Sequence, residues 1–365
     1  MLSRRGHDIL VVCSEDGPLP KRLRQTGIAV EIIPFGGSTV QDIFHILTAT
    51  IRLIKLLRRY RPDVVHCHLI KAMVVGRIAA AMARVPVCIS QLGGPLPLEI
   101  TPLRYLDLST AWLDKTIIAS SNALCQIYKR YAHTRKKVVL NYYGFDLSQF
   151  LEEVDGMEAK QEFSIPPDVP VIGMVAHIYK SRLKRFRKIG IKGHEVFLAA
   201  VPLVLSVHSD TRFVIVGGET FGDGTYMQKL KSMAQHLQVS ERVIFTGFRS
   251  DVPRLIAAMD LVAVPSLSEN VGGAVEPLLM CKPVVASNVG GLPDVVINNR
   301  TGLLVPPNDP IALADALNAM LSLPKSAREA MGAIGREEVI LRFELAHTID
   351  RLEAIYQIAV ARCKS

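Results

Sequence analysis

Short, continuously apolar runs alternate with longer amphipathic segments along the first part of the chain. The runs are apolar at successive positions rather than at every second one, which is typical of parallel strands buried on both faces of a sheet. The expected strands cover residues 8–13, 28–33, 63–68, 85–90, 115–120 and 137–141. Helical patterns lie between them, at residues 41–60, 71–84, 102–113 and 121–132. This alternation predicts an α/β domain whose helices cover both faces of a parallel sheet.

The pattern breaks at residues 151–170, which are first acidic and then carry Pro166, Pro167 and Pro170. Such a segment is typical of a linker between domains. The alternation then restarts, with strands expected at residues 171–175, 212–216, 243–245, 261–264, 284–286 and 302–305. The chain closes with helices expected at residues 326–342 and 345–363. We therefore divide the 365 residues into two α/β domains, at 1–165 and 166–342, each large enough to bury its own core.

The chain carries a formal net charge of +9, which favours an acidic partner such as nucleotide phosphate, anionic lipid or nucleic acid. We expect no nucleic-acid partner, because the sequence has neither zinc-finger spacing nor a basic motif interleaved with aromatic residues. The six cysteines are scattered without a Cys-x-x-Cys pair, as in proteins of a reducing compartment. We recognise no secretory signal peptide and no apolar run long enough to span a bilayer, so we expect a cytoplasmic protein.

The most informative segment, residues 265–294, sets Glu269 and Glu276 on either side of the pair Gly272-Gly273. It lies between two apolar runs and should turn from a strand into a helix, with Glu276 about two turns into that helix. The first amides of a helix lack partners and lie at the positive end of its dipole, which suits a phosphate or a sugar hydroxyl. One carboxylate could then bind sugar hydroxyls and the other a ribose. The same residues are also compatible with a plain strand–turn–helix with solvated glutamates.

The whole run of residues 265–294 resembles the donor-site signature of the family 4 retaining glycosyltransferases, which have the GT-B fold of two Rossmann-like domains facing a cleft. The family usually has seven residues between its two glutamates, whereas six separate Glu269 from Glu276, and the spacing from Glu276 to Lys282 matches. The resemblance implies that Glu276 holds the ribose and that Glu269 binds the donor sugar and acts in catalysis. It also implies donor contacts from the turn between them, through Asn270, Val271, Gly272 and Gly273.

A second part of the resemblance lies in residues 173–179 and in Lys192, which precedes a glycine. The family usually neutralises the donor diphosphate with an arginine after the first strand and a lysine before a glycine. Lys192 matches that lysine and is expected to act in catalysis, and His177 stands in place of the arginine. Arg249 stands at the position where members of the family place a residue close to the nucleotide base. The basic stretch after His177 can supply the missing cation, or else be a solvated loop or a lipid-facing surface; its members are Lys180, Arg182, Lys184, Arg185, Arg187 and Lys188.

His66 and His68 lie two apart at the carboxyl end of an expected strand, where α/β sheets bind ligands. We expect His66 to pack in the core and place His68 at the cleft as a catalytic residue, with a packing role as its alternative. Gln91 stands where the family often has a histidine before a glycine. The chain has no Asp-x-Asp motif, so we expect neither a metal site nor a cofactor. Protein cations and helix amides would then stabilise the leaving diphosphate.

One departure from the family concerns the start of the sequence. Members of the family normally have a strand, a glycine-containing loop and a helix before the segment that corresponds to residues 2–8. By comparison with the family, we expect this first βα unit to be absent from this sequence, through a misassigned start, a truncated gene or a substitute element. We therefore expect a gap or an exposed strand edge in the N-terminal sheet. The resemblance also implies that the last helix, at residues 343–365, returns to the N-terminal domain.

Together these observations predict a metal-independent retaining glycosyltransferase of polysaccharide biosynthesis. It would move a sugar from a nucleotide-diphosphate sugar, with UDP as the favoured carrier, to a lipid-linked or polysaccharide acceptor. Two alternatives stay open: another GT-B enzyme such as a sugar-nucleotide epimerase or a phosphorylase, and a degenerate subunit that binds a nucleotide sugar without activity.

The expected helix at residues 41–60 carries basic residues beside its apolar stripe, so it can rest on an anionic membrane at the inner face. Packing against the sheet is the more ordinary role for such a stripe. The stripe as we assign it consists of Ile43, Ile46, Leu47, Thr50, Ile51, Ile54 and Leu57.

Overall fold

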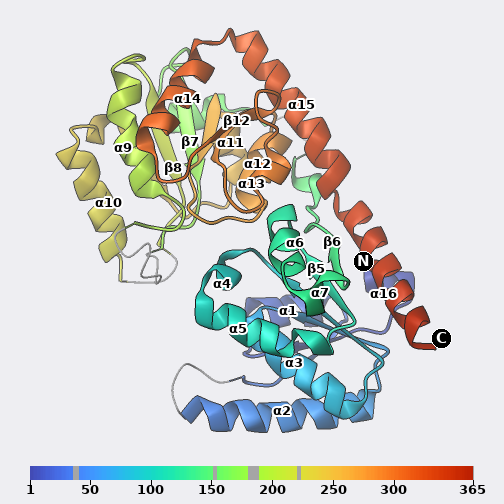
Figure 1. Cartoon of the computed structure of the whole chain (residues 1–365). Coiled ribbons are helices and arrows are strands. Elements are labelled where there is room, and N and C mark those ends of the chain that lie inside the picture. Colours follow the sequence, from blue (N-terminus) through green and yellow to red (C-terminus); the bar gives the residue numbers. More distant parts are fainter. Residues whose placement is uncertain (36–40, 151–153, 180–188, 220–222, 365) are drawn as a thin grey trace. The chain divides into compact units, whose positions relative to one another are not determined.

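The computed structural model describes residues 1–35, 41–150, 154–179, 189–219 and 223–364. The chain forms two compact units, one made of residues 1–144 and 345–365 and the other of residues 145–344 (Figure 1). We call them the N-terminal and the C-terminal unit. Within the described residues, no helix combines the length and the apolar character that a membrane span requires.

The C-terminal unit is built on a six-stranded parallel sheet in the order β12-β11-β10-β7-β8-β9. The first three strands along the chain form one half of the sheet and the last three the other half, which is the order of a Rossmann fold. Its strands are β7 (Val171–Val175), β8 (Arg212–Val216), β9 (Val243–Gly247), β10 (Leu261–Val264), β11 (Val284–Ser287) and β12 (Gly302–Val305). Strands β10 and β11 are buried throughout, as their unbroken apolar sequence requires.

Helices connect these strands and bury their apolar sides against the sheet. Helix α9 (His194–Leu205) and helix α14 (Pro310–Ser322) pack on each other and contribute to the largest apolar cluster of the unit. The remaining helices are η3 (Leu147–Phe150), α8 (Met157–Glu162), α10 (Thr225–His236), η5 (Ser240–Arg242), α11 (Val252–Ala257), α12 (Gly272–Leu279), α13 (Leu292–Val295) and α15 (Lys325–Phe343).

The N-terminal unit contains two parallel sheets rather than one, with strand orders β1-β2 and β3-β4-β5-β6. All four residues of β1 are partly exposed, whereas all six residues of β4 are buried. The expected gap in the N-terminal sheet is therefore present, since β1 pairs only with β2 and β3 only with β4 among the described residues. The strands are β1 (Leu10–Cys13), β2 (Ala29–Ile32), β3 (Val64–His68), β4 (Val87–Leu92), β5 (Thr116–Ala119) and β6 (Val138–Leu140).

Helix α16 (Leu345–Lys364) packs on one face of the four-stranded sheet, where Ala359 meets Val87, Ile89 and Ile118 (Figure 1). The C-terminal helix thus groups with the N-terminal unit. The other helices of this unit are η1 (Leu2–Arg5), α1 (Pro18–Gln25), α2 (Gln41–Tyr60), α3 (Ile70–Ala83), α4 (Leu96–Glu99), α5 (Thr101–Thr110), η2 (Ala111–Leu113), α6 (Asn122–Lys129) and α7 (Ala132–Arg135).

Only part of the apolar stripe expected on α2 faces the core of the unit. Leu53 and Leu57 are buried in the core, whereas Leu47 and Ile51 are 56% and 53% exposed. Helix α2 packs along α3, so residues on the far side of α2 stay exposed although they are apolar. The stripe we assigned was therefore too wide.

The boundary between the units lies after Gly144, about twenty residues before the one expected from the proline-rich segment. The described part of residues 145–170 packs into the C-terminal unit. A Cβ on Gly156 would lie 2.5 Å from the carbonyl carbon of Ala257, so α8 begins in close contact with the end of α11. Lys160 then donates hydrogen bonds to the carbonyls of Pro167 and Val169. These contacts make the segment part of a folded unit rather than a linker.

Candidate active site

Lys192 lies in a tight turn between β7 and α9. The N–H of Gly193 donates to the carbonyl of Gly190 at 2.9 Å, and α9 begins at the next residue, His194. Gly193 has φ of 78°, and a Cβ there would lie 2.0 Å from the carbonyl oxygen of Pro265. Only glycine combines this left-handed backbone with so close an approach. The turn therefore places Lys192 directly beside the segment that follows β10.

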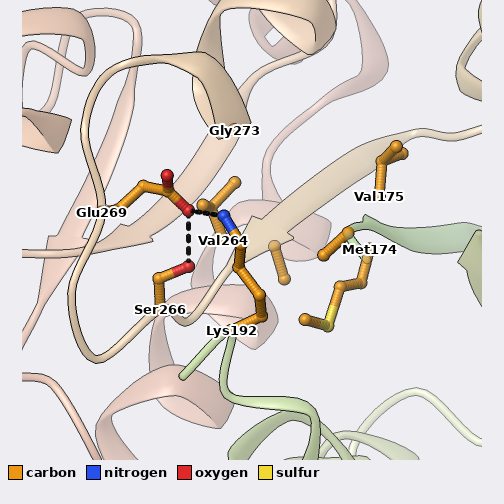
Figure 2. Close-up of a pocket in the computed structure, with 9 residues that line it drawn as sticks. Met174, Val175, Lys192, Val264, Ser266, Glu269 and Gly273 are labelled. Carbon is orange, nitrogen blue, oxygen red and sulfur yellow. Dashed lines mark hydrogen bonds and ion pairs between the residues drawn. The ribbon is translucent and has the colours of Figure 1, made fainter. Parts of the chain in front are cut away.

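The ammonium of Lys192 forms an ion pair with Oε2 of Glu269. The same oxygen accepts a hydrogen bond from the hydroxyl of Ser266 at 3.1 Å, and Oε1 accepts one from the N–H of Asn270 at 3.1 Å. Figure 2 shows Lys192 and Ser266 pointing toward the carboxylate from two different segments. The Lys192 and Glu269 side chains are 20% and 11% exposed, so the pair is partly withdrawn from water yet reachable.

The ion pair lines a small pocket. One wall comes from the end of β7 and the residues after it, at 174–176, and another from Ala263 and Val264 of β10. Gly273 at the start of α12 completes the lining with Ser266 (Figure 2). The pocket therefore lies at the carboxyl ends of two neighbouring parallel strands, where α/β sheets of this topology bind ligands.

Gly272 and Gly273 are the first two residues of α12 rather than a turn before it. Their amides lie in the first turn of the helix, where N–H groups have no partner within the helix. A Cβ on Gly273 would lie 3.1 Å from Cγ1 of Val264 and 3.5 Å from Oε2 of Glu269. Glycine here leaves room beside the carboxylate for a ligand that approaches the helix N-terminus.

Glu276 is the fifth residue of α12, so it lies just over one turn into the helix and not two as expected. It is half-buried, and burial raises the pKa of its carboxyl above the ordinary value. Val271 is buried at 1% exposure directly before the helix, and Asn270 is half-buried. Of the two glutamates, only Glu269 lines the described pocket. The ribose-binding role of Glu276 and the donor contacts of Asn270 and Val271 stay predictions.

His177 and Arg249 lie outside the lining of this pocket. His177 is exposed, with its ring 5.9 Å from that of Phe248. Arg249 donates to Asp251 at 2.8 Å and forms an ion pair with Glu162, so its charge is already compensated. The basic residues at 180–188 that could replace the family's arginine lie outside the described residues.

His66 and His68 lie at the end of β3 in the N-terminal unit, with ring centroids 4.2 Å apart. Nδ1 of His66 shares a hydrogen bond of 2.7 Å with the hydroxyl of Tyr356 on α16. Burial, reinforced by His68, lowers the pKa of His66 to about 3. His68 is exposed at the end of the strand, and partial desolvation of its ring lowers its pKa. His66 is thus a packing residue, as expected, and the catalytic role of His68 stays a prediction.

Gln91 is 4% exposed in β4, near the end of the strand. A Cβ on the nearby Gly93 would lie 3.7 Å from the hydroxyl of Tyr143. The described residues include no group of three or more His, Cys, Asp or Glu side chains that could hold a metal ion.

Sequence reasoning missed Ser266, which lies three residues before Glu269 and hydrogen-bonds to it. It also missed Glu195, which lies three residues after Lys192 and is buried. The available signal was position, because Ser266 and Glu195 each lie three residues from a proposed site residue. Nothing in the sequence showed that their side chains point inward.

Comparison with known families matches both parts of the chain. Residues 1–149 match the family described as Glycosyltransferase Family 4, and residues 182–338 match the one described as Glycosyl transferases group 1. Among curated proteins, the chain is 25% identical to a UDP-Gal:alpha-D-GlcNAc-diphosphoundecaprenol alpha-1,3-galactosyltransferase of Escherichia coli. This match covers 98% of the chain and 90% of the relative. The chain is also 27% identical to a 2-deoxystreptamine glucosyltransferase of Streptomyces kanamyceticus, over 97% of the chain and 90% of the relative.

Solved structures share the fold over nearly the whole chain. A glycosyltransferase from Rickettsia africae superposes with a TM-score of 0.81 at 21% identity, covering 98% of this chain and 92% of that one. Anabaena Alr3699/HepE in complex with UDP superposes with a TM-score of 0.80 at 24% identity, covering 94% and 90%. The two Rossmann-like units, the two family matches and the glycosyltransferase relatives agree. The chain belongs to the family 4 glycosyltransferases of GT-B fold, and it is a glycosyltransferase.

Proposed function

We propose that this enzyme is a retaining glycosyltransferase that takes its sugar from a nucleotide-diphosphate sugar, with UDP as the carrier. The observation that carries the proposal is that Lys192, Glu269 and Gly273, in the first turn of α12, line one pocket. A cation and helix amides suit a diphosphate, and a carboxylate suits sugar hydroxyls. The Escherichia coli relative is named for a UDP-galactose donor, and the Anabaena structure holds UDP, which supports the choice of carrier.

The proposed chemistry needs a cation at the leaving group. As the bond from the anomeric carbon to the diphosphate stretches, negative charge grows on the phosphate oxygens. The ammonium of Lys192 and the amides of Gly272 and Gly273 would stabilise this charge, while Glu269 holds the donor sugar and Glu276 the ribose. In the front-face mechanism implied by the family resemblance, the leaving phosphate helps to deprotonate the acceptor hydroxyl, with retention at the anomeric carbon. We propose that no metal ion or cofactor takes part.

For the acceptor we propose a lipid-linked or polysaccharide sugar in polysaccharide biosynthesis. The Escherichia coli relative is named for an acceptor linked to diphosphoundecaprenol, which supports a lipid-linked substrate. Helix α2 offers a matching surface, because an exposed stripe runs from Leu47 and Ile51 to Lys55 and Arg58. Apolar residues followed by basic ones suit an anionic bilayer surface. We therefore propose a cytoplasmic enzyme that binds peripherally to the inner face of the membrane.

Calorimetric titration with UDP-, GDP- and ADP-linked sugars tests the donor. We expect binding of one UDP-sugar, and transfer of its sugar to a lipid-linked acceptor without added divalent metal. Absence of binding to any of the three classes by folded protein would overturn the proposal. Loss of turnover in a chelator with recovery in manganese would overturn the metal-independent part.

The same assay separates the two alternatives. A product that is an altered nucleotide sugar, formed without acceptor, would identify an epimerase. Binding of the nucleotide sugar with neither release nor transfer of sugar would identify a subunit without activity. The configuration of the transferred sugar, read by NMR at the anomeric carbon, decides whether the reaction is retaining.

A further inference from the structure

Glu195 is a carboxylate in the first turn of α9 that is only 8% exposed. Its Oε2 accepts a hydrogen bond from the backbone N–H of Gly190 at 2.9 Å. Its Oε1 accepts one from the hydroxyl of Tyr226 at 2.6 Å and one from the ammonium of Lys229 at 3.2 Å. Burial of a carboxylate costs free energy unless hydrogen bonds replace its water, so these contacts are what hold the charge in place.

The Gly190 amide that Glu195 binds belongs to the turn that carries Lys192. That turn is closed by the hydrogen bond from Gly193 to Gly190. The carbonyl of Ile191, in the same turn, accepts a hydrogen bond from the N–H of Leu267 at 2.8 Å. This bond holds the turn against the segment that follows β10. Glu195 therefore anchors the first residue of the turn, and the segment after β10 anchors the second.

Tyr226, at 4% exposure, packs directly on the same turn. A Cβ on Gly190 would lie 2.3 Å from the tyrosine hydroxyl, so glycine is needed for this approach. Lysine carries its charge on a flexible four-carbon stem. The direction in which Lys192 extends thus depends on how firmly its backbone is held.

We propose that Glu195 is a positioning residue for Lys192 in donor binding. It fixes the turn at residues 190–193 through the Gly190 amide, while Tyr226 holds the carboxylate in its orientation. The ammonium of Lys192 itself pairs with Glu269, so Glu195 acts through the backbone and not by charge pairing with the lysine. The inference rests on the proposed binding of a nucleotide diphosphate beside Lys192.

Calorimetric titration with UDP and with uridine tests this role, because only UDP carries the phosphates that Lys192 would contact. We expect Glu195→Ala to weaken the affinity for UDP by about tenfold and to leave the affinity for uridine unchanged. Glu195→Gln should restore most of the affinity, since an amide oxygen can accept the Gly190 hydrogen bond. Lys231→Ala, at an exposed position on the same helix as Tyr226, is the matched control and should leave UDP affinity unchanged.

A double-mutant cycle with Lys192→Ala separates positioning from general stability. If Glu195 acts through Lys192, Glu195→Ala should have no further effect on UDP affinity in the Lys192→Ala background. Full additivity of the two losses would overturn the proposal.

Loss of the carboxylate leaves the Tyr226 hydroxyl buried without its acceptor, which could unfold the protein. The pair Glu195→Ala with Tyr226→Phe removes that hydroxyl and should keep the fold, checked by thermal unfolding. Equal UDP affinity of this folded double variant and the wild type would contradict the positioning role. Failure of the wild type to bind UDP would instead overturn the proposed function itself, so the two failures are distinguishable.

Discussion

The ammonium of Lys192 and the carboxylate of Glu269 form an ion pair across 77 residues of sequence, at the carboxyl ends of two neighbouring parallel strands. In the free protein each side chain thus neutralises the other. Under the proposed function, a donor diphosphate that binds Lys192 would have to compete with this ion pair. A donor sugar that hydrogen-bonds to Glu269 would lower the free-energy cost of breaking the pair, so we expect recognition of the sugar and of the diphosphate to be coupled.

Replacement of Lys192 by alanine should weaken donor binding more than the loss of one contact would. The substitution would remove the proposed hydrogen bond to a phosphate. It would also leave Glu269, at 11% side-chain exposure, without its cation beside the incoming negative charge. We expect UDP-sugar affinity to fall by about ten- to a hundredfold by calorimetry. Lys231→Ala, on the exposed side of α10, is the control and should bind as the wild type does. Unchanged affinity of Lys192→Ala would remove Lys192 from the site.

Alanine at Gly273 should lower activity without lowering stability. Its Cβ would come 3.1 Å from Val264 and 3.5 Å from the Glu269 carboxylate, which fills space at the helix N-terminus. Alanine favours a helix over glycine by about 1 kcal/mol, which offsets the crowding. We therefore expect a rise in KM for the donor and a melting temperature close to that of the wild type. An unchanged KM would show that the space beside Gly273 is not used by the donor.

Stability of the N-terminal unit should decrease in acid through His66. Its pKa is lowered to about 3 in the folded protein, from an ordinary value of 6.5. Below pH 6.5 the unfolded chain takes up a proton that the folded protein does not, so stability is lost as the pH falls from about 6.5 toward 3. His66→Gln, which can keep the hydrogen bond to Tyr356, should flatten this dependence in urea unfolding followed by Trp112 fluorescence.

The control for this experiment is His236→Gln, because His236 is exposed at the end of α10 in the other unit. It should reproduce the wild-type dependence of stability on pH. A His66→Gln variant whose acid sensitivity equals that of the wild type would assign the effect to other groups.

Membrane binding should depend on the exposed apolar residues of α2. Replacement of both Leu47 and Ile51 by serine removes apolar area from a surface that also carries Lys55 and Arg58. We expect the double variant to float less with anionic vesicles at low salt than the wild type does. Ile311→Ser, at a position 64% exposed in the C-terminal unit, is the matched control and should leave flotation unchanged. No flotation of the wild type would reject the proposed membrane surface.

The sequence predicted most elements because a periodic pattern is local. The unbroken apolar run at 261–264 predicts a buried strand, and β10 has those bounds. The pattern at 326–342 predicts a helix, and α15 extends it by one residue at each end. The pattern could not tell which apolar residues of α2 face the core, because that depends on the side from which α3 packs. It also could not reveal that the segment with Pro166 and Pro170 packs into a domain.

The sequence by itself determined the repeated strand–helix order, the glutamates on either side of a glycine pair and the lysine before Gly193, since each is a property of neighbouring residues. Only the tertiary structure decided which charges meet. Arg77 looks like a surface residue of a small-residue helix, yet it is fully buried between Asp107 and Asp114. Lys192 finds Glu269 because the parallel sheet brings β7 beside β10. Pairing across such distances follows from strand order, which no local pattern of residues encodes.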